Sequence, residues 1–288
     1  MIDLTTLPLP AVLEPLDFEA IYAAKLARFR LLYPDFSAVL ESDPAIKLLE
    51  LAAYDELVCR ARINDAARSC FLAYAEKEDL DNKAADYNVS RLLLDPGDPD
   101  AIPPREPVWE DDERLRYRCQ LALEGLSVAG SRQAYLFHTL SASASILHAD
   151  IDSVQGGEVR VWLLGQSPDG AVDPLVVEQV RQALSAETVR PLCDQVQVLQ
   201  ARPLPFTIDA RISWQEGGEQ ISGGLPAARQ RVASMLASRR QIRASVPRSA
   251  IDAALHVPGV ERVTLLQPAQ DVLCGPGQFP HCQEVKLQ

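Results

Sequence analysis

The sequence lacks the motifs by which most catalytic and metal-binding sites are first recognised. It contains no C-x-x-C pair, no H-E-x-x-H, no glycine-rich phosphate loop and no paired catalytic carboxylates. Its six cysteines are scattered along the 288 residues, whereas a zinc site needs four ligands at close spacing. We therefore expect no catalytic residue, no metal ion and no cofactor.

Long apolar runs are missing as well. No segment approaches the roughly 20 apolar residues that a membrane-spanning helix needs. The N-terminal stretch has an acid at Asp3, prolines among its apolar residues and no basic region, so it does not resemble a targeting segment. We expect a protein made in the cytoplasm, with reduced thiols and no membrane contact.

Positive charge is scarce, and lysine is the scarcest source of it. The net charge of −12 argues against binding of nucleic acid by the whole surface, because phosphates would be repelled. Of the 28 basic residues, 23 are arginines and five are lysines. Arginine suits fixed, two-pronged ion pairs across packed interfaces, although genome composition could produce the same bias.

What the sequence does contain is typical of a globular α+β protein, with 47% hydrophobic and 24% charged residues. We expect a helical bundle region over 1–95 and a proline-rich acidic connector over 96–112. A first α+β module, entered through a helix–loop–helix, then covers 113–200. A second α+β module and a C-terminal tail cover 201–288.

A long helix from about Pro44 to Ala75 is the main N-terminal element. Asp43 is a capping residue, Pro44 fits the first turn, and no glycine or proline follows before Pro96. Its apolar stripe includes Ile46, Leu49, Leu57, Phe71 and Tyr74. Further apolar residues lie off this stripe, namely Leu48, Leu51, Val58 and Ile63. More than one face therefore needs covering, which favours a bundle with part of the packing supplied by another chain.

The connector over 96–112 holds five prolines and several acids. Because proline locks φ, we expect a stiff, extended arm. The acidic run Glu110–Glu113 suits the positive N-terminal end of the next helix. Gly125 is a candidate for the end of that helix.

The segment from Gly125 to Gly130 has a serine, Ser127, between two glycines, and His138 follows it. A nucleophile elbow has the form G-x-S-x-G and leaves a strand. Here the spacing is G-x-S-x-x-G and the preceding element is a helix. We therefore favour a loop between two helices, with Ser131 as the cap of the second, over a serine hydrolase that uses Ser127 and His138.

From Ile146 onward, short strands alternate with helices, which predicts two small tandem α+β sandwiches. Residues 146–154 and 157–165 form a predicted hairpin, and a helix begins at Asp173-Pro174. The later strands are expected at 193–201, 205–214 and 259–268, and the later helices at 224–240 and 247–256. A weak internal echo pairs Arg132, Ala134 and His138 with Arg248, Ala250 and His256.

Two further segments have unusual composition. No acid occurs between Glu219 and Asp252, where six arginines lie: Arg229, Arg231, Arg239, Arg240, Arg243 and Arg248. Without interleaved aromatics this is a poor nucleic-acid patch. A solvated helix face or a basic interface to an acidic partner, with Arg239, Arg240 and Arg243 as candidates, is favoured. In the tail, Cys274, His281 and Cys282 predict a free-thiol loop rather than a zinc site.

Several stretches, in order and spacing, resemble the baseplate assembly protein J family, the wedge components of contractile phage tails and R-type pyocins. The longest is EDDERLRYRCQLALEGLSVAGSRQAYLFHTLSASASILHADIDS. The others are GEVRVWLLGQSPDG, VRPLCDQVQV, RSAIDAALHVPGVERVTL and DLDNKAADYNVSRLLLDPGDPDAIPP. Together they cover nearly the whole chain.

This resemblance implies a structural protein without enzymatic activity. Two copies in different poses would join a smaller wedge protein through a helical bundle that includes the Ile46–Tyr74 helix. The C-terminal modules would contact neighbouring wedges, and the ring around the hub would hold the sheath and trigger contraction. Gly125 and Gly130 would lie in a shape-determining loop. The resemblance implies assembly in the bacterial cytoplasm and then release within a phage or a pyocin particle, and no nucleic-acid partner is expected.

Overall fold

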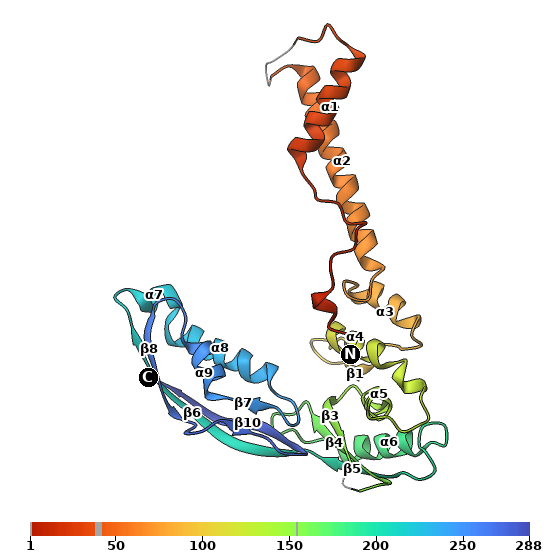
Figure 1. Ribbon diagram of the computed structural model, residues 1–288, viewed down its shortest axis with the longest axis vertical. Coiled ribbons are helices and arrows are strands. Elements are labelled where there is room, and N and C mark those ends of the chain that lie inside the picture. Colours follow the sequence, from red (N-terminus) through yellow and green to blue (C-terminus); the bar gives the residue numbers. More distant parts are fainter. Residues whose placement is uncertain (1, 38–41, 154) are drawn as a thin grey trace. The chain divides into compact units, whose positions relative to one another are not determined.

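A computed structural model describes residues 2–37, 42–153 and 155–288 of the chain (Figure 1). Its contacts divide it into two compact units. Unit 1 comprises Met1–Arg91 and Asp111–Arg116, and unit 2 comprises Leu92–Glu110 and Tyr117–Gln288. The α+β class and the helical N-terminal region agree with the sequence-based prediction.

Unit 1 is helical. Its elements are the 3-10 turn η1 (Leu4–Thr6) and the helices α1 (Phe18–Leu32), α2 (Pro44–Ser69) and α3 (Lys77–Ala85). α1 and α2 lie side by side (Figure 1). The start of α2 is as predicted, because the carboxylate of Asp43 accepts the N–H of Ala45 at 2.8 Å and Pro44 occupies the first turn.

The predicted end of α2 is wrong. The helix stops at Ser69, and the chain turns through 70–75 instead of continuing to Ala75. Arg116 holds the turn that follows, because its Nε donates to the carbonyl of Leu72 at 2.8 Å and its Nη2 to that of Ala75 at 2.7 Å. Both carbonyls lie beyond the last residue of α2, where no helical N–H bonds them, and this guanidinium satisfies them.

The expectation of a stiff, extended arm over 96–112 is also wrong. Strands β1 (Leu93–Asp95) and β2 (Val108–Trp109) pair antiparallel, and a bridge joins Asp98 to Arg105, so the segment folds back on itself. Gly97 makes the turn possible, since its φ is +70° and an added Cβ would lie 2.3 Å from the Arg105 carbonyl oxygen.

The middle module of unit 2 has a three-stranded sheet covered by two helices. Its elements are α4 (Asp112–Leu121, which begins in unit 1), η2 (Glu124–Leu126), α5 (Arg132–Ala142), β3 (Ile146–Asp152), β4 (Glu158–Gly165), α6 (Pro174–Ser185) and β5 (Gln195–Gln200). In the order β3-β4-β5, β4 is antiparallel to β3 and parallel to β5. The predicted hairpin is confirmed, except that Val154 lies outside the described residues.

Buried apolar residues from α5, α6 and the sheet form the core of this module. The helix cap predicted at Asp173 is confirmed by a 2.8 Å bond from the N–H of Leu175. The helix predicted to reach Gly125 ends earlier, at Leu121, and a 3-10 turn takes its place.

The C-terminal module has the same general construction. Its elements are β6 (Arg202–Trp214), α7 (Gly218–Ser222), α8 (Gly224–Ser238), β7 (Ser245–Val246), α9 (Arg248–Leu255), β8 (Val260–Gln267), β9 (Val272–Leu273) and β10 (Gln278–Leu287). The main sheet has the order β10-β6-β8, with β6 parallel to β10 and antiparallel to β8. A small β7–β9 pair completes it.

The C-terminal tail is a strand from Gln278 on, so the predicted loop is wrong for the part that contains His281 and Cys282, whereas Cys274 lies in a loop and both thiols are free as predicted. β10 pairs with β6 from Gln278 opposite Arg202 to Leu287 opposite Ala210. Phe279 and Leu287 are buried. Pro280 is tolerated because β10 is an edge strand. The pairing partner is distant in the sequence, so local composition gave no sign of this strand.

The internal echo corresponds to an equivalent contact in the two modules. Arg132, at the start of α5, donates from Nε to the carbonyl of Ile151 near the end of β3, at 2.7 Å. Arg248, at the start of α9, donates from Nη2 to the carbonyl of Leu265 near the end of β8, at 3.0 Å. The two strands also have the same place in their sheets. β3 is antiparallel to the central strand β4, and β8 is antiparallel to the central strand β6.

We predict that Gly130→Ala destabilises the middle module. Gly130 has a φ of +72°, and an added Cβ would lie 2.7 Å from the Asp194 carboxylate and from Pro191 Cγ. The left-handed backbone alone costs roughly 1–2 kcal/mol, and the crowding adds to this. The midpoint of urea unfolding measures the loss.

The matched control is Gly156→Ala, because nothing lies within 4 Å of its added Cβ. This change should be neutral or stabilise by up to about 1 kcal/mol. Equal losses in the two variants would show that the contacts around Gly130 do not fix the loop.

Candidate functional site

Ser127 and His138 are not joined in the structure. Ser127 follows η2, and its Oγ accepts the N–H of Ala129 at 3.3 Å. His138 lies within α5, and its Nε2 is 3.0 Å from the carbonyl oxygen of Gly125. No hydrogen bond connects the two side chains among the described residues. The loop therefore lacks the serine–histidine pair that a nucleophile requires.

The loop instead has the features of a helix–loop–helix. Ser131 caps α5, with its Oγ accepting the N–H of Ala134 at 3.1 Å. Gly125 is required by space, because an added Cβ would lie 2.2 Å from the ring of Phe137. Gly130 is required by its positive φ. The cap at Ser131 is as predicted, whereas the role of the loop in assembly stays a prediction.

No metal centre is formed by the residues that the structure describes, since no group of three or more histidines, cysteines and acids comes together. Burial raises the pKa of the Cys274 thiol to about 11, and burial also raises the pKa of Cys282. Both thiols are protonated at neutral pH, and the thiolate is the form that binds metal.

Five of the six arginines of the 229–248 segment bond to other groups of the chain, and Arg229 has no bond among the described residues. Arg239 donates to the carbonyl of Ser245 at 2.9 Å, and Arg240 to that of Gln166 at 3.1 Å. Arg243 forms an ion pair with Asp152 at 2.9 Å. Any acidic partner would have to compete with these contacts. The basic interface predicted for Arg239, Arg240 and Arg243 stays a prediction, with less free charge available than the sequence suggested.

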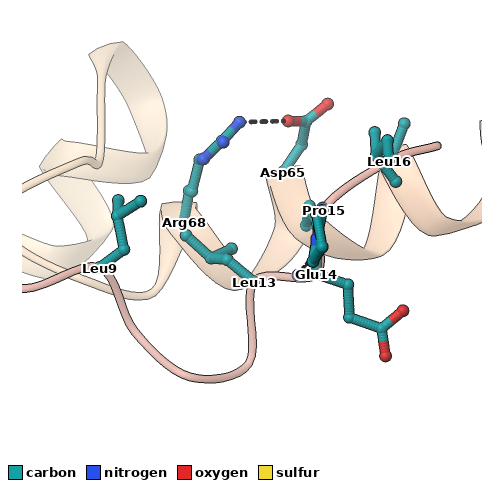
Figure 2. Close-up of a pocket in the computed structure, with 9 residues that line it drawn as sticks. Leu9, Leu13, Glu14, Pro15, Leu16, Asp65 and Arg68 are labelled. Atoms are coloured by element: carbon teal, nitrogen blue, oxygen red, sulfur yellow. Dashed lines mark hydrogen bonds and ion pairs between the residues drawn. The ribbon is translucent and has the colours of Figure 1, made fainter.

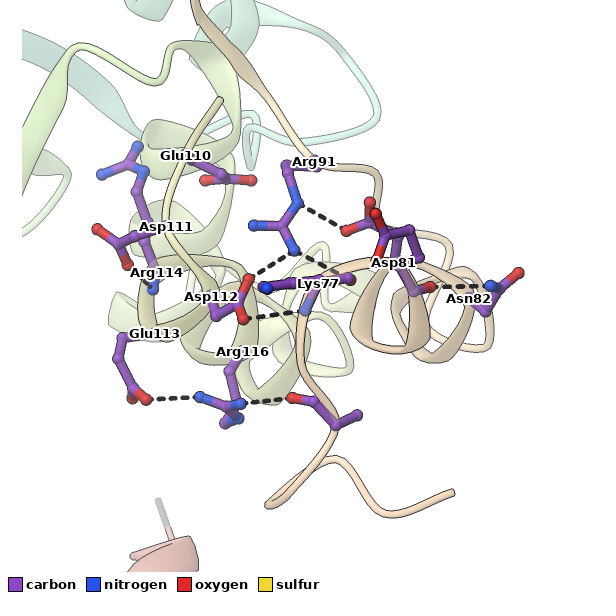
Figure 3. A network of polar contacts seen from close by, with 12 residues as sticks. Lys77, Asp81, Asn82, Arg91, Glu110, Asp111, Asp112, Glu113, Arg114 and Arg116 are labelled. Carbon is purple, nitrogen blue, oxygen red and sulfur yellow. Dashed lines mark hydrogen bonds and ion pairs between the residues drawn. The ribbon is translucent and has the colours of Figure 1, made fainter. Parts of the chain in front are cut away.

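Asp112, at the start of α4, is part of a polar network in unit 1 (Figure 3). Asp112 accepts the N–H of Lys77 at 3.0 Å and pairs with Arg91 at 2.8 Å. Burial opposes ionisation of Asp112, but these two bonds lower its pKa below the ordinary value. Arg91 also pairs with Asp81 at 2.6 Å. The network ties α3 to the start of α4, so these acids have a structural use.

A segment before α1 runs along α2 and is anchored at Asn64. The side-chain oxygen of Asn64 accepts the N–H of Glu14 at 3.1 Å, and its Nδ2 donates to the Glu14 carbonyl at 2.8 Å. Asn64 is only 5% exposed. A groove of about 460 Å³, lined by Leu9, Leu13 and Arg68 among others, lies beside this anchor (Figure 2).

The inner face of α2, which we define as Ile46, Ala53 and Asn64 with the half-buried Leu49 and Leu57, is the buried side of this helix. α1 packs against α2, and Lys25 on α1 pairs with Glu56 on α2 at 2.6 Å. Three of the five predicted bundle residues thus have packing inside the chain.

The remaining two predicted bundle residues lie beyond the end of α2. The rings of Phe71 and Tyr74 meet edge-on, with centroids 6.5 Å apart. Phe71 is 40% exposed.

The opposite side of α2 has no cover in the described chain. We define its outer face by five exposed residues: Leu48, Leu51, Tyr54, Val58 and Ile63, with exposed fractions of 66%, 56%, 57%, 48% and 60%. Four of them are the residues that lie off the main stripe in the sequence. Tyr54 was missed, although its position three residues after Leu51 gave the signal.

Comparisons with known proteins show the family of the chain. Three family profiles match the chain: the Baseplate J-like N-terminal domain over 41–98, the Baseplate J-like central domain over 127–200 and the Baseplate J-like protein C-terminal domain over 206–288. The chain belongs to the baseplate J family. It is 39% identical over 294 residues to Baseplate protein J of Escherichia phage P2, covering 100% of this chain and 97% of that protein.

Membership of this family supports a structural role in a phage-type baseplate. The N-terminal profile contains α2 and α3, so the outer face lies within a segment shared with the family. The central profile begins at residue 127 and therefore contains Ser127 itself.

We predict that Asn64→Ala releases the segment around Glu14. The variant removes both bonds to the Glu14 backbone, and buried hydrogen bonds of this kind contribute about 0.5–1.5 kcal/mol each. Hydrogen exchange in the peptide that contains Glu14 should rise severalfold. Arg68→Ala is the control, because Arg68 pairs only with the exposed Asp65 among the described residues. Unchanged exchange in Asn64→Ala would contradict the anchor.

We predict that His138 contributes to acid sensitivity. Burial lowers the pKa of His138 below its ordinary value of 6.5, against the opposing bond to Gly125. A lowered folded-state pKa gives stability that is present above 6.5 and is lost as pH falls through the folded-state pKa.

His138→Gln keeps a donor for the Gly125 carbonyl but does not titrate. It should lose less stability than the original chain between about pH 7 and about pH 5. His148, whose pKa burial also lowers, is present in both proteins, so the difference reports on His138. Parallel stability profiles would contradict the prediction.

Proposed function

We propose that the chain is a structural wedge protein of the baseplate of a contractile tail or R-type pyocin particle. Two copies in different poses join a smaller wedge protein through a helical bundle built on α2. Wedges then associate into a ring with hub and sheath proteins, and the ring holds the sheath and triggers contraction. The observation that carries this proposal is the uncovered outer face of α2.

Packing within one chain does not account for a helix of this length. α2 has 26 residues, about 39 Å, yet only Ile46, Ala53 and Asn64 are buried. Most helix stability in proteins comes from burial of an apolar face. α1 contributes little more, since Ile21 is its one buried residue. Additional helices from other chains would supply the missing burial.

The outer face has the composition of an interface. Exposed apolar residues that are contiguous on one element mark sites of protein association. Asp55 and Arg62 also lie on this side of α2, and neither has an ion pair or hydrogen bond among the described residues. Charges at the margin of an apolar seam favour one register and one partner over others.

Unit 2 would supply contacts between neighbouring wedges. The loop before α5 exposes Leu123, Leu126 and Val128, at 69%, 78% and 64%. Gly125 and Gly130 hold this loop in shape. Its apolar residues are suited to a partner surface.

The proposed role is not enzymatic and involves neither nucleic acid nor a membrane. None of the described helices has the length and apolar character to cross a bilayer. The chain would be made in the bacterial cytoplasm and then become part of the released particle.

We predict that Leu51→Glu combined with Val58→Glu abolishes assembly but not folding. Both side chains are exposed, at 56% and 48%, so the isolated chain should keep its stability. At a buried interface the two carboxylates would lose water without gaining partners, which weakens association by roughly 100-fold or more. A tagged chain purified from a producing cell, followed by mass spectrometry, measures the loss of co-purifying baseplate proteins.

Leu175→Glu is the matched control, since Leu175 is 74% exposed on α6. It should retain its partners. Normal co-purification by the double variant would overturn the bundle proposal, and loss in Leu175→Glu would show that any added charge disrupts the particle.

A further inference from the structure

The turn 239–244 joins α8 to β7 in the C-terminal module, and three of its residues, Arg240, Ile242 and Arg243, contact the middle module. Arg240 donates to the carbonyl oxygens of Gln166 at 3.1 Å and Gly165 at 3.4 Å, and also to that of Ser167. Gly165 is the last residue of β4, and Gln166 and Ser167 follow it in the loop. One guanidinium therefore binds a whole loop of the other module.

Arg243 makes a second attachment. Its Nε lies 2.5 Å from Asp150 Oδ2, and its Nη2 lies 2.9 Å from Asp152 Oδ2, both on β3. Arg243 also has a φ of +62°, which is strained for a residue with a side chain. Its N–H donates to the carbonyl of Gln278 at 2.8 Å, which holds the strained backbone in place.

An apolar contact lies between these two arginines. Ile242 is 5% exposed and belongs to a cluster with Trp162 and Leu164 of the middle module and Phe279 of β10. The N–H of Ile242 also points to His148 Nδ1, at 3.4 Å. The approach is close, because a Cβ added to Gly277 would lie 2.5 Å from the Trp162 ring.

The covalent linker between the modules is a single residue. β5 ends at Gln200 and β6 begins at Arg202, so Ala201 alone separates them. The N–H of Ala201 bonds to the Leu163 carbonyl at 2.8 Å, in the middle module. The N–H of Arg202 bonds to the Gly277 carbonyl at 2.7 Å, in the C-terminal module.

We propose that the turn 239–244 is a latch that makes the middle and C-terminal modules one rigid body. The modules then do not flex about Ala201. A force that displaces one module therefore moves the other with it. Two arginine attachments flank one buried apolar residue, and the junction itself is bonded on both sides. This inference concerns the isolated chain and does not depend on the proposed assembly.

Hydrogen exchange of the full chain, followed by mass spectrometry, tests the latch. In the original protein, the peptides that contain Ile242 and Arg202 should be protected as well as the centre of β6. In Arg243→Ala, exchange in both peptides should rise about tenfold, while β6 and β8 keep their protection. A parallel rise at two sites distant in the sequence is the signature of separating modules.

Two further variants make the test specific. Arg229→Ala removes an exposed arginine from α8 that has no bond among the described residues, so exchange should not change. Arg243→Gly also removes the ion pairs but suits a positive φ, so its exchange should rise less than that of Arg243→Ala. If Arg243→Ala failed to fold, Arg240→Ala, which removes only the bonds to the loop carbonyls, should raise exchange in the same two peptides.

Fast exchange at Arg202 in the original protein would overturn the latch, because the junction would then already be flexible. Unchanged exchange at both peptides in Arg243→Ala would overturn it too. So would an equal rise in Arg229→Ala, since the effect would then follow from lost charge alone.

Discussion

Guanidinium groups bound to backbone carbonyls stabilise this chain at the ends of its helices and strands. Helix ends and loops leave carbonyl oxygens without partners inside their own element. Arg116 binds those that follow α2, Arg132 and Arg248 bind those at the ends of β3 and β8, and Arg240 binds the loop after β4. Each guanidinium has five donors in one plane, so a single side chain can satisfy several carbonyls at fixed angles.

This use of arginine bears on the function. In the arginine-rich 229–248 segment, five arginines bond to other groups of the chain: Arg231, Arg239, Arg240, Arg243 and Arg248. The guanidinium groups that the sequence suggested for an acidic partner mostly form bonds within the chain. The scarcity of lysine agrees with this, because an ammonium group is a point charge and does not bridge carbonyls in a fixed plane.

The sequence predicted features that depend on neighbouring residues. The caps at Asp43, Ser131 and Asp173 lie where expected, because a capping side chain bonds a backbone N–H only a few residues away. The end of α2 and the strand β10 were missed, because both depend on distant groups. The hairpin between β1 and β2 was missed for a related reason, since proline content shows stiffness but not direction.

The candidate site, the outer face of α2, was partly predictable because its residues are close neighbours in the sequence. Helical periodicity separated two apolar sets on α2, but it did not show which of them α1 would bury. The structure buries the set that includes Ile46 and exposes the set that includes Leu51. The contacts of Arg240 and Arg243 could not be foreseen, because they require two modules to be placed against each other before either partner is known.

The two units differ in how many apolar residues their longest elements bury. Unit 2 has clusters of buried apolar residues in both modules and a third where the modules meet. In unit 1 the two longest helices bury only Ile21, Ile46, Ala53 and Asn64 between them. A helix pair that buries so little of its surface is marginal unless another chain adds to its core. We expect unit 2 to fold in the free protein, whereas in the proposed bundle α1 and α2 would gain stability when a partner covers the outer face. In the proposed wedge, such coupling would make the two helices a checkpoint, because their stability would depend on the partner that covers the outer face.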